Sequence, residues 1–428
     1  MAPKINRLAG SIGVAAVCLC LLQGLNEACA AASDKSADWT SSWGAALMVP
    51  SAKAALKKEE LGEFTLRQVM RLSAGGNRLR VRISNLYGSE PLVLGAATIG
   101  RVGRPASSAL LDSLETLRFD GQAGVTVPPG GEYVSDPIEW KAARGDDLTL
   151  SLFFKALPQQ QSAHVAAHAT QFIAPGDQSS QTDLKDARKA TSWYQVSGIE
   201  VVADPRPSVV VAVGDSITDG SGSTMDGNDR WTDFLIGRLA EEGSATAGVV
   251  NAGIGGNCML RECIGPPLLE RFERDVLQRP GVTHAIVLIG VNDLGRLHRG
   301  KTESPQSRAA MLADLKSGWR ELVQRAHKQG VCLIAGTLTP YGGSTLYKPL
   351  PENESDRQAM NDWIRTSGLF DGVADFDAAV RDPAAPDRLQ GLFDSGDHLH
   401  LSPAGYRAMA SAVGLNRLAT CSAARRQQ

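Results

Sequence analysis

The hydrophobic pattern of the chain changes at about residue 204. Before that point, apolar and polar residues alternate in short runs, as in residues 78–83 (RLRVRI) and 147–152 (DLTLSL). Such alternation is typical of β-strands with one buried face, and turn-forming clusters separate the runs. The pattern therefore predicts a β-sandwich-like N-terminal domain over residues 37–203.

After residue 204, mostly apolar runs of strand length alternate with stretches of helical spacing. Strands are expected at residues 208–213, 249–250, 285–289, 331–335 and 372–376. Helices are expected at residues 231–242, 268–277, 309–329, from about 355, and 403–413. Apolar strands between amphipathic helices predict a parallel sheet covered on both faces, in a second domain over residues 204–422. In such sheets, ligands bind beyond the carboxyl ends of the strands.

One long segment fits neither pattern. Residues 159–180 are largely polar or small and read as a loop. His164 and His168 lie inside it and could line a site, but histidines on a surface loop are the favoured interpretation.

Charge and the N-terminal residues suggest an exported protein that does not bind nucleic acid. The 428 residues include 44 Lys and Arg against 46 Asp and Glu, whereas phosphate binding needs a clustered basic excess. Lys4 and Arg7 precede an apolar run at residues 12–22, followed by small residues. This predicts a signal peptide over residues 1–32 and a periplasmic or extracellular protein. A membrane anchor is the alternative, but the run is short for a bilayer, and no later segment predicts stable membrane insertion.

Seven cysteines become four if the leader is removed: Cys258, Cys263, Cys332 and Cys421. In an exported protein, an even number permits disulfides, and four cysteines allow three pairings. The pair Cys258–Cys263 is favoured because the two residues are close in one expected loop. Free buried thiols remain the alternative, and Cys332, near the start of an apolar run, fits it. No cysteine and histidine spacing indicates zinc.

Four polar clusters lie at or near the carboxyl edge of the predicted sheet. They are GDSITDG at residues 214–220, NAGIGGN at 251–257, GVND at 290–293 and DHLHLSP at 397–403. Taken singly, each also reads as a turn, a flexible loop or a helix cap. Together they place a serine, glycine N–H groups, an amide and an Asp–His pair where chemistry is expected.

The last cluster offers two histidines as a base. Asp397 and His400 are three residues apart, a spacing that lets the carboxylate reach the imidazole. His398 is the rival base, but a direct neighbour of Asp397 is poorly placed to be oriented by it. A metal-binding interpretation of this cluster lacks a convincing third ligand.

In this order, the four clusters resemble the sequence blocks of the SGNH (GDSL-like) hydrolase superfamily, over about residues 208–414. The resemblance implies a flavodoxin-like three-layer α/β/α fold. It also implies Ser216 as nucleophile, Asp397 and His400 as acid and base, and no metal or organic cofactor. The oxyanion donors would be the N–H groups of Ser216 and Gly256 and the side-chain amide of Asn292. Ile217 stands where the name-giving motif has leucine, an apolar exchange of little consequence.

Four neighbouring residues are interpreted as structural. Asp215 and Asp293 are expected to organise their loops, and Arg230 and Trp231 to pack at the start of a helix.

The substrate is less well defined by the sequence. The strand-rich N-terminal part, with its WTSSW segment at residues 39–43, resembles a branch of secreted bacterial xylan-type acetyl esterases. This implies a small acyl ester as substrate, such as an acetyl group on a polysaccharide. The alternatives are a lipase, lysophospholipase or thioesterase of the same superfamily, or an inactive carbohydrate-binding protein. The N-terminal domain binds carbohydrate, shapes the cleft or only packs, and the oligomeric state is left open.

Overall fold

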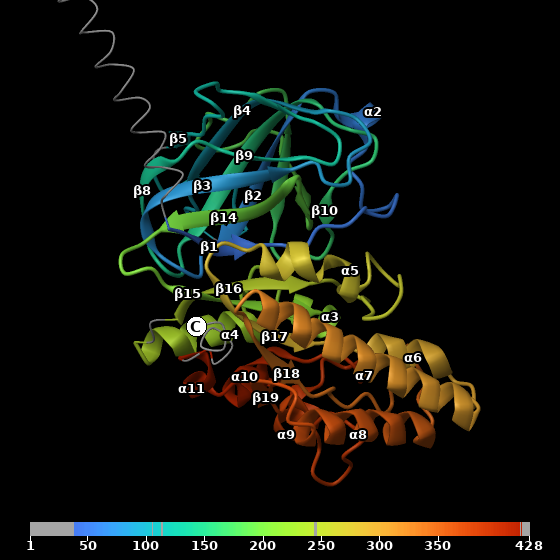
Figure 1. Cartoon of the computed structure of the whole chain (residues 1–428). Coiled ribbons are helices and arrows are strands. Elements are labelled where there is room, and N and C mark those ends of the chain that lie inside the picture. Colours follow the sequence, from blue (N-terminus) through green and yellow to red (C-terminus); the bar gives the residue numbers. More distant parts are fainter. Residues whose placement is uncertain (1–37, 105, 113, 244–245, 420, 422–428) are drawn as a thin grey trace, which may run out of the picture. The chain divides into compact units, whose positions relative to one another are not determined.

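Alternating side chains in the first half of the chain form antiparallel sheets around one core. The computed structural model describes residues 38–104, 106–112, 114–243, 246–419 and 421, so the predicted signal peptide at residues 1–32 lies outside the described residues (Figure 1). In strand β3 (Gly76–Ser84), Leu79 and Ile83 are fully buried. Arg80 and Arg82 point to the other face, where both pair with the carboxylate of Glu200.

The first sheet of the described residues has the strand order β1-β14-β3-β7, and β8 also pairs with β3. Besides β3, its strands are β1 (Trp39–Gly44), β7 (Glu132–Val134), β8 (Ile138–Ala142) and β14 (Val196–Val202). All its pairings are antiparallel.

The second sheet has the order β12-β11-β2-β9-β4-β5, and β6 also pairs with β4. Its strands are β2 (Phe64–Arg71), β4 (Leu92–Arg101), β5 (Glu115–Thr116), β6 (Val125–Val127), β9 (Asp147–Ala156), β11 (Gln171–Pro175) and β12 (Arg188–Ala190). The short strands β10 (Ala163–His164) and β13 (Trp193–Tyr194) pair separately, and helix α2 spans Lys58–Leu61. Residues of both sheets share one hydrophobic core, which is the β-sandwich arrangement that the alternation predicted.

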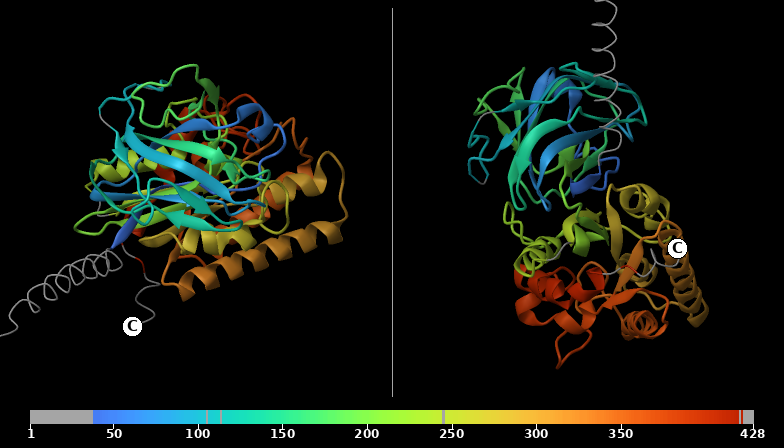
Figure 2. Two further views of the ribbon diagram at one scale, coloured as in Figure 1. Left: turned by 90° about the horizontal axis from the view of Figure 1, so that it is seen from above. Right: turned by 60° about the vertical axis from the view of Figure 1, so that its left-hand side comes forward.

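The second half of the chain forms a parallel sheet with the order β16-β15-β17-β18-β19. Its strands are β15 (Ser208–Gly214), β16 (Thr246–Gly253), β17 (Val282–Leu288), β18 (Cys332–Gly336) and β19 (Gly372–Ala374). This is the flavodoxin-like strand order. The run Val209–Val213 is completely buried, because helices cover both faces of the sheet (Figures 1 and 2).

Two layers of helices enclose this sheet. The described helices are α3 (Ser216–Asp219), α4 (Trp231–Glu241), α5 (Leu268–Phe272), α6 (Val291–His298), α7 (Pro305–Lys328), α8 (Pro351–Thr366), α9 (Phe376–Val380), α10 (Pro403–Ala412) and α11 (Leu415–Leu418). A π-helical turn, Glu273–Leu277, continues α5, and a 3-10 turn spans Gly391–Phe393. Helix α4 packs with α10, and α5 and α8 each contact α7. Among the described helices, none combines the length and apolar character needed to cross a bilayer.

The β-rich part and the α/β part contact each other along strand β16. The predicted boundary near residue 204 falls in the turn between β14 and β15. Strand β1 lies against β16, and the Ser41 N–H donates to the Pro280 carbonyl at 2.9 Å. The Val249 N–H of β16 donates to the Ser73 hydroxyl at 2.9 Å. Because β16 is the edge strand of the parallel sheet, the β-rich part covers that edge.

Two disulfides are present in the described residues. Cys258 is joined to Cys263, the pair that the sequence favoured. Cys332, the first residue of β18, is joined to Cys421, so the free-thiol alternative is wrong for this pair. The second link joins residues that are 89 positions apart and fastens Cys421 to the sheet.

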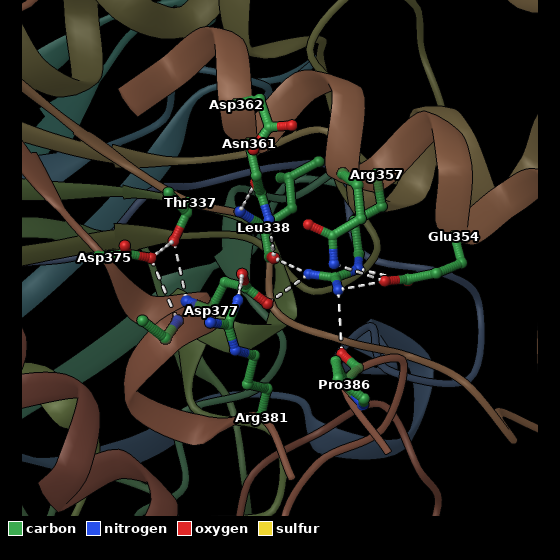
Figure 3. Close-up of polar contacts among 12 residues, drawn as sticks. Thr337, Leu338, Glu354, Arg357, Asn361, Asp362, Asp375, Asp377, Arg381 and Pro386 are labelled. Carbon is green, nitrogen blue, oxygen red and sulfur yellow. Dashed lines mark hydrogen bonds and ion pairs between the residues drawn. The ribbon is translucent and has the colours of Figure 1, made fainter. Parts of the chain in front are cut away.

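A buried polar network holds the chain where it leaves β18 (Figure 3). The Arg357 guanidinium donates to Asp377 at 2.6 Å, to the Leu338 carbonyl at 2.8 Å and to Glu354 at 2.6 Å. The Asn361 amide donates to the same Leu338 carbonyl and accepts from the Leu338 N–H. These contacts fix the start of the loop that follows β18.

Arg357→Met is expected to lower the free energy of unfolding by about 3 kcal/mol, because it leaves the fully buried Asp377 and the Leu338 carbonyl without this donor. A urea titration measures the loss. Arg388→Met, at an exposed side chain, is the control and is expected to change little. An equal effect of both variants would contradict the structural role of Arg357.

Candidate active site

Ser216 is positioned by a tight strand-to-helix connection. Strand β15 ends at Gly214, Asp215 caps the helix, and Ser216 is the first residue of α3. A Cβ atom at Gly214 would lie 2.1 Å from the Leu288 carbonyl oxygen, so this packing requires glycine. As the first helical residue, Ser216 has no intrahelical acceptor for its N–H. Its N–H is therefore available to a ligand.

Asp215 organises this turn, as the sequence suggested. Its carboxylate accepts the Ile217 N–H at 3.0 Å, and its other oxygen is buried without a partner among the described residues. Burial raises the pKa of Asp215 from its ordinary value of 3.8 to about 7, and the neighbouring Asp293 adds to the rise.

The raised pKa of Asp215 predicts a pH-dependent stability. Between about pH 4 and pH 7, the unfolded chain has lost this proton while the folded protein keeps it, so raising the pH destabilises the fold. Asp215→Asn removes the titrating group. The stability of the variant relative to wild type, as the difference between their free energies of unfolding, is therefore expected to depend on pH. This difference should rise by about 4 kcal/mol in favour of the variant between about pH 4 and pH 8. Urea titrations across this range test it, and a pH-independent difference would contradict the assignment.

A histidine and a carboxylate from the loop before α10 complete a hydrogen-bonded chain with Ser216. His400 Nε2 lies 2.8 Å from Ser216 Oγ, and His400 Nδ1 lies 2.5 Å from Asp397 Oδ2. Asp397 also accepts the His400 backbone N–H at 2.8 Å. Partial burial alone would raise the pKa of Asp397, but the hydrogen bonds from His400 hold it well below its usual value. The carboxylate is therefore ionised at neutral pH and orients the imidazole.

The rival base, His398, has a different partner. Its Nδ1 lies 2.5 Å from Asp394, and its side chain is about half exposed. The structure thus contains two neighbouring Asp–His pairs, of which the one with His400 reaches Ser216. The two histidines have separate carboxylates, which does not favour a shared metal.

The loop after β16 brings glycine N–H groups beside α3. A Cβ atom at Gly253 would lie 2.3 Å from the Asp219 nitrogen, so the loop rests directly on the helix. Gly256 has φ +74°, a conformation that favours glycine. Within the described part of the chain, its N–H donates to no protein group. Both Gly256 and Ser216 therefore present free donors.

Asn292 is held by two contacts. Its Nδ2 donates to the Asn257 carbonyl at 2.8 Å, and its Oδ1 accepts from the Tyr347 hydroxyl. An amide nitrogen carries two hydrogens, so one remains for a ligand. Tyr347 therefore fixes the orientation of the amide. Sequence reasoning missed this tyrosine, since no motif signals it.

Asp293, next to Asn292, organises the neighbouring loop as expected. Its carboxylate accepts the Met259 N–H at 2.9 Å and the Leu260 N–H at 3.3 Å. Burial raises the pKa of Asp293. These contacts hold the segment that follows Cys258.

The interpretation of residues 159–180 as a surface loop is wrong for His164. This residue belongs to β10, is 5% exposed, and bonds to Asp219 in the first cluster at 2.9 Å. His168 is half-buried, and its pKa is lowered to about 4 by burial and, to a smaller extent, by the nearby Arg230. Arg230 does more than pack, because its guanidinium donates to the Asp219 carbonyl at 2.9 Å. Trp231 packs as expected and is fully buried.

Within the described ranges, a further cluster has metal-ligating residue types. The ligand atoms of His284, Cys332 and Cys421 lie within 4.8 Å of one another. The two cysteines form a disulfide, so their sulfurs are not thiolate ligands.

One protein-family model matches the α/β part of the chain. The model of the GDSL-like Lipase/Acylhydrolase family matches residues 212–408, which include all four sequence clusters. No match was found among curated proteins.

The chain is also similar to solved structures. A GDSL-like lipase from Bacteroides thetaiotaomicron has 15% identity and a TM-score of 0.36, over 49% of this chain and 88% of that one. An acetylxylan esterase from Geobacillus stearothermophilus has 22% identity and a TM-score of 0.35, over 48% and 93%. The M. smegmatis aryl esterase has 14% identity and a TM-score of 0.37, over 48% and 95%.

The family match over residues 212–408 supports a carboxylic ester hydrolase. More narrowly, the α/β part of the chain, over residues 212–408, is similar to the GDSL-like Lipase/Acylhydrolase family, and an antiparallel β-rich part precedes it.

Proposed function

We propose that this protein is a serine esterase that removes small acyl groups, with acetyl esters of a polysaccharide as substrates. The observation that carries the proposal is the continuous chain from Ser216 Oγ through the His400 imidazole to the Asp397 carboxylate, with contacts of 2.8 and 2.5 Å. A serine hydroxyl is a weak nucleophile, and an adjacent base activates it.

In the proposed mechanism, His400 Nε2 accepts the Ser216 proton as Oγ attacks the ester carbonyl carbon. Asp397 keeps the proton of His400 on Nδ1 and stabilises the imidazolium that forms. His400 then protonates the departing alcohol oxygen, which leaves an acyl group on Ser216. A water molecule, deprotonated by His400, releases the acid and restores the hydroxyl.

The tetrahedral oxyanion would be bound by the N–H groups of Ser216 and Gly256 and by the Asn292 amide. The orientation of the amide is held by its contacts with Tyr347 and Asn257. Loss of one such donor typically costs about 3 kcal/mol of transition-state stabilisation.

Gly256 lies beside an apolar side chain of the segment that follows it. The Ile264 side chain lies against it, so closely that a Cβ atom at Gly256 would be 2.6 Å from Ile264 Cδ1. The Cys258–Cys263 disulfide restrains the segment just before Ile264. Ile264 is 41% exposed, so an apolar side chain lies at the surface beside a proposed oxyanion donor. The small size of the acyl group follows from the resemblance to xylan-type acetyl esterases. Polysaccharide and export to the periplasm or beyond follow from the resemblance and the expected signal peptide, and two disulfides fit an oxidising compartment.

The test combines a substrate series with active-site labelling. Hydrolysis of p-nitrophenyl esters from acetate to long chains is expected to peak at acetate, and acetylated xylan is expected to release acetate. A fluorophosphonate probe is expected to modify Ser216 in mass spectrometry. A peak at long chains would favour the lipase alternative. No turnover of any ester, with polysaccharide binding retained, would favour the carbohydrate-binding alternative.

A further inference from the structure

The side chain of His164, a residue of the β-rich part, contacts the α/β part of the chain. It lies in β10, packs beside the Trp193 ring at 5.5 Å, and is 5% exposed. Its Nδ1 lies 3.0 Å from the Ala46 carbonyl, and its Nε2 lies 2.9 Å from Asp219 Oδ1. It is therefore a buried side chain of one part that bonds directly to a motif of the other.

The geometry makes this histidine a cation. Nδ1 faces a carbonyl oxygen, and Nε2 faces the Asp219 carboxylate, with the Ala166 carbonyl at 3.2 Å. Because each ring nitrogen has only acceptors as partners, both nitrogens carry protons. Burial alone would lower the pKa of His164, but Asp219 raises it above the usual value. Arg230, His168 and Tyr406 are the other titratable groups that act on the pair.

Asp219 connects this cation to the loop that bears Gly256. One carboxylate oxygen binds His164, and the other accepts the Gly255 N–H at 2.8 Å. Asp219 is also the last residue of α3, the helix that begins with Ser216. A single buried carboxylate thus connects helix α3, the loop that bears Gly256 and the β-rich part.

We infer that His164 is a positioning residue. Through it, the β-rich part holds the loop that bears Gly256 in the conformation that presents the Gly256 N–H to the oxyanion. His164 fixes the Asp219 carboxylate, the carboxylate fixes the Gly255 N–H, and this sets the direction of the adjacent Gly256 N–H. The inference rests on the proposed esterase function. It assigns the β-rich part a role in turnover that does not depend on binding carbohydrate.

The test compares His164→Gln and His164→Leu with wild type in p-nitrophenyl acetate hydrolysis. Misplacement of one catalytic group by about 1 Å costs about 100-fold in rate. We expect kcat to fall at least tenfold in His164→Gln, which keeps one donor, and further in His164→Leu, with KM within about twofold of wild type. His327→Gln is the matched control, since it removes another His–Asp pair, of 2.7 Å with Asp371, at the end of α7.

A thionoacetate substrate separates positioning from general loss of structure. Its sulfur accepts hydrogen bonds weakly, so the wild-type preference for the oxygen ester reports the oxyanion donors. That preference is expected to shrink in both His164 variants and to persist in His327→Gln. Asp219→Asn is the second variant, for use if His164→Gln or His164→Leu does not fold. It keeps the size of the side chain, and it is expected to shrink the substrate preference in the same way.

The outcomes are distinct. Unchanged kcat and unchanged substrate preference in a folded His164→Gln protein would overturn the positioning role, even if its melting temperature falls. Wild-type protein that hydrolyses no ester would overturn the proposed function, and this inference with it.

Discussion

Ser216→Ala is expected to lower kcat for p-nitrophenyl acetate by about a million-fold, to a rate close to that of a protein without the triad. The substitution removes the only atom that would bond to the acyl carbon. It keeps the backbone N–H, and alanine is well tolerated in the first turn of α3. Steady-state kinetics of the purified variant measure the effect, and circular dichroism is expected to show an unchanged fold.

A contaminating esterase would mask so large a loss. Titration of the variant preparation with the fluorophosphonate probe supplies the control. A contaminating esterase would react with the probe in a small fraction of the protein, whereas activity of the variant itself would require one reactive site per molecule. Turnover within about tenfold of wild type, with no probe-reactive contaminant, would exclude Ser216 as the nucleophile.

The second large effect is expected at His400. His400→Gln should lower kcat by about a million-fold as well, because Ser216 and its base act as one unit. His398→Gln is the matched control: it lies two residues away, pairs with Asp394, and is expected to change kcat less than tenfold. The pair of variants therefore distinguishes the two histidines of one short segment.

Adding Ser216→Ala to His400→Gln is expected to cause little further loss, since either change alone disables the nucleophile. If His398→Gln proves to be the inactive variant, the contact between His400 and Ser216 is not the catalytic one. Equal, moderate losses in both would indicate a general disturbance of the loop before α10.

The sequence predicted the parallel sheet well, because a strand that is buried on both faces appears in the sequence as an uninterrupted apolar run. The run Val209–Val213 is apolar throughout, and a polar cluster follows it where the strand ends. Parallel strands end at one edge, so Ser216, Gly256 and Asn292 could be expected together without knowing any tertiary contact. The π-helical turn after α5 was not predicted, since a single extra residue per turn leaves the spacing of the apolar residues nearly unchanged.

The contacts that orient the site residues could not be predicted in the same way. His164 sits in a polar stretch, and its burial depends on Asp219, which is 55 residues away. Tyr347 reaches Asn292 across a similar separation of 55 residues. Neither partner can be selected by local pattern, because hydrophobic periodicity reports which face is buried and not which polar group lies there.

The cover that β1 provides for strand β16 has a consequence for anyone who trims or recombines this protein. A fragment that starts near residue 204 would keep every proposed catalytic residue, yet it would uncover the outer edge of β16, where the Val249 N–H now donates to the Ser73 hydroxyl. Open edges of this kind invite pairing between molecules. Such a fragment is expected to assemble into larger species on concentration. Transplanting the hydrolase part into a chimera would therefore require a replacement strand, or charged side chains placed along that edge.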